Sequence, residues 1–257
     1  RSGPPSPKRG RRELLRLAAL GLGGVAVACG RGDDSETQTG QTEPRPTGAK
    51  PRASATPAAE QPAAVAGEQQ CLVTKKQALS PDYVPNDLTL LPERLIANNG
   101  VQLRQQAADA VVKLVDAAQG EDFTLFVLSG FRSYQEQEKI LDQEVQLYGK
   151  QTAEKQVAPP GHSEHQLGLA ADITCDRAPY ELAEDFGNWP EGLWLAAGAA
   201  KFGFVVSYPR GKEPITGYIY EPWHIRYVGL PLAEEVAASG LTLTEFLPKN
   251  NLVAPCP

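Results

Sequence analysis

The sequence contains no methionine, and it has only three histidines and four cysteines in 257 residues. Because methionine is missing even at position 1, we expect the chain to lack its true start. With 41% hydrophobic and 22% charged residues, the composition suits a soluble globular protein, although the apolar residues are unevenly spread. The length alone permits one or two domains.

The apolar run near the N-terminus, LLRLAALGLGGVAVA, is short for a membrane-spanning helix, which needs about 20 apolar residues. It follows the basic stretch KRGRRELLR and ends in small residues, as a secretory signal does. The paired Arg11 and Arg12 resemble a twin-arginine signal, and VAC at 27–29 resembles a bacterial lipoprotein cleavage site. We expect residues 1–29 to be an export segment with Cys29 acylated. A simple signal anchor with an incidental cysteine is the alternative.

Residues 30–70 have almost no large apolar side chains. Such a segment cannot bury enough surface to offset the entropy lost on ordering it. Its Pro, Ala, Thr, Gln and Gly content predicts a solvated, disordered linker that holds a domain away from a membrane surface. The globular domain is therefore expected at 71–257.

The expected domain lacks an excess of basic residues. Residues 1–70 hold 10 of the 25 Lys and Arg and 7 of the 31 Asp and Glu, so residues 71–257 hold 15 and 24. The resulting net charge is −9. Domains that bind nucleic acid present basic patches, so nucleic acid is not an expected partner.

Three cysteines fall in the expected domain, namely Cys71, Cys175 and Cys256. Disulfides are permitted outside the cytoplasm. Cys71 and Cys256 open and close the domain, and chain termini often lie close together, so these two are one candidate pair. Pairings with Cys175 are equally open, and one of the three must stay unpaired.

Helix signals recur at several places in the domain. Apolar residues keep helical spacing from about 100 to 118, and Gly120 stops that pattern. Ser133 with Glu136 forms a capping-box pattern for a helix that runs to Gly149. Two further helices are expected, one over 191–203 and a short final one capped by Thr242 with Glu245.

Strands are expected at 123–129, 167–174, 204–209 and 223–228, where short apolar or alternating runs occur. The segments 81–97 and 150–163 contain prolines and polar residues, so we expect them to be irregular. Helices and strands alternate without a regular β-α-β period. The pattern therefore favours an α+β fold over a doubly wound sheet.

Chemistry-bearing residues gather in PPGHSEHQLGLAAD at 159–172, where Asp172 follows His165 by seven residues. The third histidine, His224, starts an expected strand on which it shares a face with Arg226. Two histidines and one carboxylate are typical of a catalytic zinc, with water at the fourth position. Zinc lowers the pKa of that water to about 7, and Glu221 lies three residues from one ligand as a candidate base.

Three stretches carry a family resemblance. SEHQLGLAAD fits the pattern S-x-H-x-x-G-x-A-x-D, EPWH fits E-x-W-H, and SGFRSYQEQ fits the S-G-[FY]-R-S segment that precedes them. In this order they resemble the peptidase M15 family of D-alanyl-D-alanine carboxypeptidases. The resemblance covers about 72–247 and is strongest to the branch of vancomycin-resistance-type D,D-carboxypeptidases and L,D-carboxypeptidases. It implies a zinc D-Ala-D-Ala peptidase (Hedgehog-like) fold, with a small antiparallel sheet flanked by helices.

The resemblance also implies roles for matching residues. The implied Zn2+ ligands are His165, Asp172 and His224. Glu221 is the implied general base, which deprotonates the water and later protonates the leaving amine. Arg132 is expected to stabilise negative charge at the scissile carbonyl or to bind substrate, because a guanidinium matches oxyanions and carboxylates. Ser163 and Gln137 are expected to contact the stem peptide or its terminal D-residue.

Each assignment has a structural alternative. Ser163 is also placed to cap its loop, Gln137 to be an exposed helix residue, and Arg132 to form a salt bridge. Trp223 is expected in the core rather than in the site. His162 matches no ligand position, and we expect it in a loop beside the cleft.

Taken together, the residues and the resemblance predict a zinc-dependent carboxypeptidase that removes the C-terminal D-alanine from peptidoglycan stem peptides. We expect a monomer held at the outer face of a membrane by its N-terminal anchor. The alternatives are a peptidoglycan endopeptidase, a D-Ala-D-Ala dipeptidase, and a non-catalytic wall-binding module with the same fold. The sequence leaves open whether the removed D-alanine follows a D-residue or an L-centre.

Overall fold

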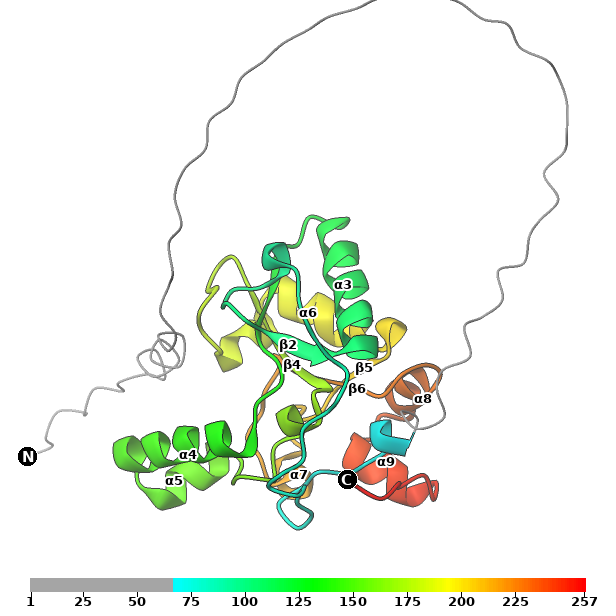
Figure 1. The fold of residues 1–257 in the computed structure, drawn as a ribbon. Coiled ribbons are helices and arrows are strands. Elements are labelled where there is room, and N and C mark those ends of the chain that lie inside the picture. Colours follow the sequence, from blue (N-terminus) through cyan, green and yellow to red (C-terminus); the bar gives the residue numbers. More distant parts are fainter. Residues whose placement is uncertain (1–66) are drawn as a thin grey trace, which may run out of the picture.

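A four-stranded antiparallel sheet in the order β3-β4-β6-β5 lies at the centre of the fold (Figure 1). The computed structural model describes residues 67–257. The strands of this sheet are β3 (Leu125–Ser129), β4 (Ala170–Cys175), β5 (Phe204–Val206) and β6 (His224–Tyr227). A separate antiparallel pair is formed by β1 (Leu88–Leu90) and β2 (Gln102–Arg104). The expected α+β class is therefore confirmed.

Helices surround this sheet. The α-helices are α3 (Gln105–Gln119), α4 (Tyr134–Tyr148), α5 (Lys150–Gln156), α6 (Pro190–Gly198), α7 (Glu213–Thr216), α8 (Leu232–Ser239) and α9 (Leu243–Lys249). The short 3-10 helices of residues 67–257 are η2 (Glu93–Leu95), η3 (Glu164–Leu167), η4 (Glu184–Asn188) and η5 (Ala199–Phe202). In Figure 1, α3 and α6 lie at the top of the view, whereas α4 with α5 and α8 with α9 lie at the bottom. Within residues 67–257 we find no helix with the length and apolar character to span a bilayer.

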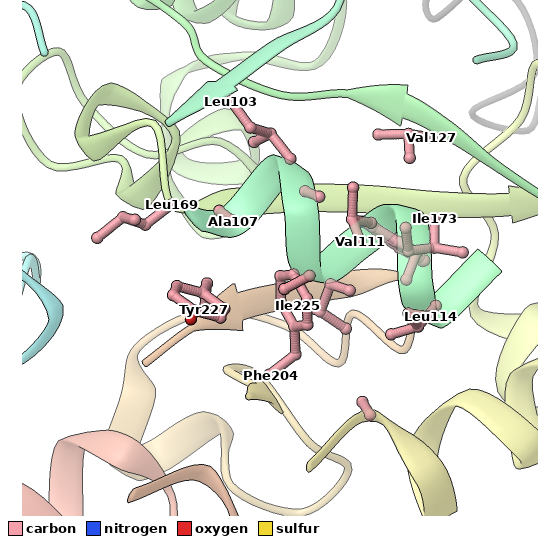
Figure 2. Packing of buried hydrophobic residues seen from close by; sticks show 14 of the residues in the cluster. Leu103, Ala107, Val111, Leu114, Val127, Leu169, Ile173, Phe204, Ile225 and Tyr227 are labelled. Atoms are coloured by element: carbon pink, nitrogen blue, oxygen red, sulfur yellow. The ribbon is translucent and has the colours of Figure 1, made fainter. Parts of the chain in front are cut away.

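The main core forms where α3 packs on the sheet (Figure 2). The helix buries an apolar stripe that includes Val111 and Leu114, as its 3.6-residue spacing predicts. Against it lie Ile173 of β4, Phe204 of β5 and Ile225 of β6, all fully buried. Burial of each large apolar side chain contributes roughly 1.5–3 kcal/mol, so this interface fixes β4 and β6 firmly in place.

Both predicted capping boxes are confirmed. Ser133 Oγ accepts from the Glu136 N–H at 3.2 Å, and Glu136 Oε2 accepts from the Ser133 N–H at 2.8 Å. Thr242 and Glu245 make the same reciprocal pair at the start of α9. These are local signals, which explains why the sequence alone could place both helix starts.

Several sequence-based boundaries are wrong: the strands expected at 167–174 and 204–209 are shorter, the helix expected at 191–203 is divided into α6 and η5, and three other segments contain an element that was not expected. The helix expected from about 100 begins at 105, because residues 102–104 pair with β1 instead. The segment 81–97 is accordingly not wholly irregular, since it contains β1 and η2. The expected loop 150–163 contains α5, whose buried Ala153 packs in a hairpin with α4. The last three errors share a cause: the stabilising contacts come from another part of the chain.

The two ends of the described chain are joined by a disulfide between Cys71 and Cys256. Cys175 is buried and free, so the candidate pairing of the domain's first and last cysteines is confirmed. The loop that this bond closes spans 185 residues of sequence.

The folded part begins earlier than expected. The export segment 1–29 with Cys29, and the linker as far as residue 66, lie outside the described residues. Residues 67–70, however, were assigned to the linker and are part of the fold. Gln69 is buried and its Nε2 donates to Gln106 Oε1 at 2.7 Å, while Glu68 pairs with Arg104. We call residues 67–71 the N-terminal strap. Composition alone could not predict its contacts, because they are made partly by the backbone.

Candidate metal centre

The pairing of β4 with β6 brings two of the predicted ligands together. Asp172 and His224 are register partners, and Asp172 Oδ1 lies 3.2 Å from His224 Nδ1. His165 approaches from η3, with its Nε2 3.3 Å from Asp172 Oδ2. The three side chains are buried, with only 3–4% of each residue exposed. Their donor atoms all lie within 4.8 Å of one another, so the predicted set does converge.

The short helix η3 aims His165 at the sheet. Ser163 caps it, with Oγ accepting from the His165 N–H at 3.4 Å. Gly168 ends it with φ +67°, and a Cβ there would lie 2.9 Å from Arg104 Cγ. The glycine of the motif is therefore needed by the backbone, which turns at this point from η3 into β4.

A glycine also fixes the second nitrogen of His165. His165 Nδ1 lies 2.6 Å from the carbonyl oxygen of Gly130. A carbonyl can only accept, so Nδ1 carries the proton and Nε2 presents its lone pair to the centre. Gly130 packs so closely against the backbone of β2 that an added Cβ would lie 2.3 Å from Gln102 O. The strand before it is also irregular, with a register shift between Val127 and Ser129, as is common beside active sites.

His224 is oriented in the same way by a carboxylate. Its Nε2 lies 2.9 Å from Glu164 Oε2, and an ionised carboxylate can only accept. The Nε2–H therefore donates to Glu164, and Nδ1 faces Asp172. Hydrogen bonding of the outer ring nitrogen to a carbonyl or a carboxylate is the usual arrangement of histidines that bind metals.

The spacing of the donor atoms fits a small tetrahedral cation. With bonds of about 2.0–2.2 Å, two ligand atoms of a tetrahedral zinc lie about 3.3–3.6 Å apart. Asp172 Oδ1 lies 3.2 Å from His224 Nδ1, and Asp172 Oδ2 lies 3.3 Å from His165 Nε2, so each nitrogen is close to that spacing from one carboxylate oxygen. Two nitrogens and one carboxylate leave a fourth position for water or substrate, which is the arrangement of catalytic zinc sites.

The electrostatics also favour a cation. Burial opposes the charge of Asp172, but His165 and His224 hold the pKa of that carboxyl well below its usual range. Burial likewise opposes the charge of Glu164, but the hydrogen bond from His224 and the charge of Arg226 lower its pKa to about 2. Burial disfavours the protonated form of His224, yet Asp172 and Glu164 raise its pKa to about 10. The two buried carboxylates thus place negative charge next to His224.

Arg132 lies at the edge of the centre. Its Nη1 donates to Gln137 Oε1 at 2.9 Å, its Nη2 donates to Ser129 Oγ at 3.0 Å, and Nη2 is 3.9 Å from Asp172 Oδ2. The side chain is 20% exposed, so it borders both the protein and the solvent. The ion pair foreseen as its alternative role does exist, but the partner is the candidate ligand Asp172.

Gln137 is not an exposed helix residue. It is 2% exposed, and its Nε2 donates to the carbonyl of Ala158 at 2.7 Å while its Oε1 holds Arg132. The alternative interpretation of Gln137 is therefore wrong, because the start of α4 faces the loop before η3. Gln137 fixes the guanidinium beside the centre.

Glu221 stands on the turn that leads into β6. Its N–H donates to the Tyr208 carbonyl at 3.0 Å, and its own carbonyl accepts from the His224 N–H at 3.2 Å. The residue is half-buried. Burial lowers the pKa of Arg132, and the charges of Asp172 and Glu221 partly oppose that effect. The predicted base and the predicted cation thus act on each other at the rim of one site.

Of the other residues considered in the sequence analysis, Trp223 and His162 lie outside the ligand set, and Ser163 caps a helix beside it. Trp223 is 2% exposed and belongs to the main core, as expected. His162 turns its Nδ1 to the Thr74 carbonyl at 2.6 Å and contributes no ligand. Ser163 is buried and caps η3, which is its structural alternative; its contact with a peptide stays a prediction.

Sequence reasoning missed two charged residues beside the centre, Glu164 and Arg226. Both are buried, and Arg226 is fully so. Glu164 stands inside the first motif at a position that the pattern leaves unspecified. Arg226 was noted only as sharing a strand face with His224. That shared face, together with the adjacency of Glu164 to a ligand, was the available signal.

One other group of possible ligands occurs in the described part of the chain, formed by Cys175, Asp176 and Glu191. Arg177 Nε already donates to both oxygens of Glu191, at 3.0 and 3.2 Å. Asp176 is exposed. This group has neither the oriented imidazoles nor the burial of the first.

Comparisons with known proteins agree with this geometry. Residues 100–230 match the family model described as "VanY: D-alanyl-D-alanine carboxypeptidase". The chain is 44% identical over 181 residues to the putative carboxypeptidase YodJ of Bacillus subtilis (strain 168), across 69% of this chain and 66% of that protein. The chain thus spans just under two thirds of that relative's length.

Solved structures show the same fold. The structure of the LdcB LD-carboxypeptidase is similar with a TM-score of 0.67 and 40% identity, over 75% of this chain and 89% of that one. A mutant of the vancomycin-resistance D,D-pentapeptidase VanY, solved in complex with Zn(II), has a TM-score of 0.60 and 34% identity. That match covers 70% of this chain and 98% of the VanY chain.

Proposed function

The chain belongs to the VanY family of D-alanyl-D-alanine carboxypeptidases, and from this we propose that it is a zinc-dependent carboxypeptidase of peptidoglycan stem peptides. It removes the C-terminal D-alanine. The observation that carries the proposal is the buried convergence of His165, Asp172 and His224, in which each imidazole turns one nitrogen to the centre.

These three residues would hold Zn2+, which is the ion present in the VanY structure. The donor set fits, since each nitrogen lies close to the tetrahedral spacing from a carboxylate oxygen, and three ligands leave one position of a tetrahedral ion open. When bound, zinc acts as a Lewis acid that lowers the pKa of water and polarises the scissile carbonyl.

Glu221 acts as the general base. It takes a proton from the attacking water and later delivers it to the nitrogen of the leaving D-alanine. A carboxylate serves this purpose when it is within hydrogen-bond reach of the water and titrates close to the working pH. Support comes from its place on the turn before His224, half-buried at the rim of the centre.

Arg132 binds the negative charge that develops on the carbonyl oxygen, or the carboxylate of the terminal residue. Gln137 and Ser129 hold the guanidinium from one side, so less conformational freedom is lost when an anion binds. Gln137 therefore acts through Arg132. Ser163 would bind the peptide only if its hydroxyl formed a second hydrogen bond besides the one that caps η3.

We place the enzyme outside the cytoplasm, as a monomer. The support for this location is the N-terminal sequence, whose basic and apolar segments end at Cys29 and are followed by a polar linker. Acylation of Cys29 would anchor the chain at the membrane and leave the domain within reach of the wall.

The test is release of D-alanine from a synthetic stem pentapeptide and a stem tetrapeptide, with and without a chelator. Zinc-dependent release from the pentapeptide indicates D,D-specificity, and release from the tetrapeptide indicates L,D-specificity. The non-catalytic wall-binding module predicts release from neither. Cleavage of an internal bond of the peptide would indicate an endopeptidase instead of a carboxypeptidase. Cleavage of free D-Ala-D-Ala would indicate a dipeptidase. Failure to release D-alanine from either peptide in the zinc-loaded protein would overturn the proposal.

A further inference from the structure

A chain of buried charges runs away from the metal centre. His224 lies at its inner end, Glu164 follows, and Arg226 stands behind, with exposed fractions of 3%, 5% and 0%. Burying charged groups is costly unless each is paired and hydrogen-bonded. Such an arrangement therefore needs a reason beyond packing.

Glu164 is held on three sides. Its Oε2 accepts from His224 Nε2 at 2.9 Å and from Ser207 Oγ at 2.6 Å. Its Oε1 lies 3.6 Å from Arg226 Nη1. These three contacts prevent the carboxylate from rotating away from His224. It is therefore a fixed acceptor for the outer nitrogen of His224.

Arg226 is fixed in turn by the N-terminal strap. Its Nη2 donates to the backbone carbonyls of Glu68, Gln69 and Cys71, at 3.1, 3.4 and 3.4 Å. Its Nε donates to the Tyr227 carbonyl at 3.2 Å. Within the described residues Nη1 has no hydrogen-bond acceptor, so its interaction is with the Glu164 carboxylate. The strap thus holds the guanidinium with one edge toward Glu164.

We propose that Glu164 is a positioning residue for the metal centre, and that Arg226, clamped by the N-terminal strap, keeps Glu164 in place. The inference rests on the metal site of the proposed function. Glu164 selects the His224 tautomer that has the proton on Nε2, so that Nδ1 is free to bind the metal. It touches neither substrate nor metal, and it acts through the imidazole.

The opposite tautomer shows what Glu164 contributes. With the proton on Nδ1, His224 would direct an N–H at the position of the cation and lose a ligand atom. A free imidazole exchanges between its two tautomers, so a fixed acceptor removes this competition. Loss of such an outer partner typically weakens metal affinity or activity by 10–100-fold.

The experiment measures zinc affinity without substrate. Metal-stripped Glu164→Gln, Ser207→Ala and parent proteins are titrated with zinc in competition with a chromophoric chelator. The matched control is Glu121→Gln, in the exposed turn after α3. We expect Glu164→Gln to bind zinc about 10–100-fold more weakly than the parent. Ser207→Ala should show a smaller loss in the same direction, and Glu121→Gln none.

A second readout distinguishes positioning from stability alone. In the zinc-loaded parent, an NMR spectrum that correlates the imidazole nitrogens with their protons should show His224 with the proton on Nε2 in a strong hydrogen bond. That proton signal should shift upfield in Glu164→Gln. A purely structural role would lower the melting temperature but leave the zinc affinity of the folded protein and the Nε2–H signal unchanged.

A folded Glu164→Gln that binds zinc like the control would overturn the inference. Should that variant not fold, Ser207→Ala decides, because unchanged affinity with an unchanged Nε2–H signal contradicts the proposal. The proposed function fails on a different result, namely a zinc-loaded parent that releases no D-alanine. The two failures are therefore separable.

Discussion

Asp172 of β4 and His224 of β6 face each other across one rung of the sheet, with Oδ1 and Nδ1 3.2 Å apart. Directly opposed residues of antiparallel strands project from the same face. The Ile173 N–H donates to the Trp223 carbonyl at 2.9 Å, so a backbone hydrogen bond holds the neighbouring rung. Two of the three proposed ligands are thus positioned by sheet pairing, and only His165 depends on a short helix.

We predict that Glu221→Gln retains zinc but loses turnover. The amide cannot take a proton from water, and general-base catalysis contributes roughly 10²–10⁴-fold. Zinc content is measured by elemental analysis and D-alanine release by chromatography, with Glu121→Gln as the control. A variant that cleaves stem peptide at the parent rate would remove Glu221 from the role of base.

Replacement of Arg132 by Lys should lower kcat/KM for the stem peptide by about 10²–10³-fold, with zinc content unchanged. A lysine cannot reproduce the planar fork that Gln137 and Ser129 hold. Arg94→Lys, at an exposed ion pair with Asp116, is the matched control and should be neutral. Equal activity of the two variants would show that Arg132 does not contact the reacting groups.

Removal of zinc should lower stability as well as activity. A ligand that binds only the folded state stabilises it by about 2.7 kcal/mol when present at 100 times its dissociation constant. We therefore expect a chelator to lower the melting temperature, and stoichiometric zinc to restore it. Magnesium should not restore it, because that ion prefers oxygen ligands in octahedral geometry. An unchanged melting temperature after complete metal removal would contradict this prediction.

Loss of the Cys71–Cys256 disulfide should destabilise the domain. The bond closes a loop of 185 residues, and a native disulfide typically contributes about 2–5 kcal/mol, largely through the unfolded chain. Urea unfolding of a Cys71→Ala, Cys256→Ala double variant should give that deficit. The reduced parent serves as the control and should match the double variant. If the two differ by more than the error of the measurement, the substitutions themselves perturb the fold.

The capping box of α9 predicts a pH-dependent stability. The Thr242 backbone N–H and the Lys212 ammonium hold the pKa of Glu245 below its ordinary value. A lowered folded-state pKa gives stability that is present above the unfolded pKa of about 4.3 and is lost as pH falls through the folded value. Glu245→Gln should therefore be less stable than the parent at pH 7. The difference should shrink below pH about 4.3.

Denaturant unfolding at a series of pH values measures this effect, with Glu121→Gln as the control. A deficit that stays constant from neutral to strongly acid pH would mean that the charge of Glu245 is not its source.

What the sequence could predict depended on how local each determinant is. The capping boxes at Ser133 and Thr242 lie within four residues, and both were predicted correctly. The metal set was predicted because its residues stand in motifs that resemble a known family. The start of α3 was missed, since residues 102–104 pair with β1, which lies earlier in the chain. No local pattern indicates such a partner.

The charged residues behind the site show a different limit. Composition placed residues 67–70 in a linker, because nothing in their side chains suggests burial. Their role is carried by backbone carbonyls, which every residue has and no sequence pattern distinguishes. The only sequence signal for Arg226 is the strand face that it shares with His224, and that signal does not indicate burial of the guanidinium. Only the folded arrangement reveals that the two belong together.

The N-terminal strap sets where proteolysis becomes harmful. Trimming that stops before Gly67 leaves every acceptor of Arg226 in place. Trimming that continues through Gln69 removes two of the carbonyl oxygens that accept hydrogen bonds from the fully buried guanidinium of Arg226. We therefore expect proteolytic release of the domain to be harmless or damaging according to a difference of a few peptide bonds.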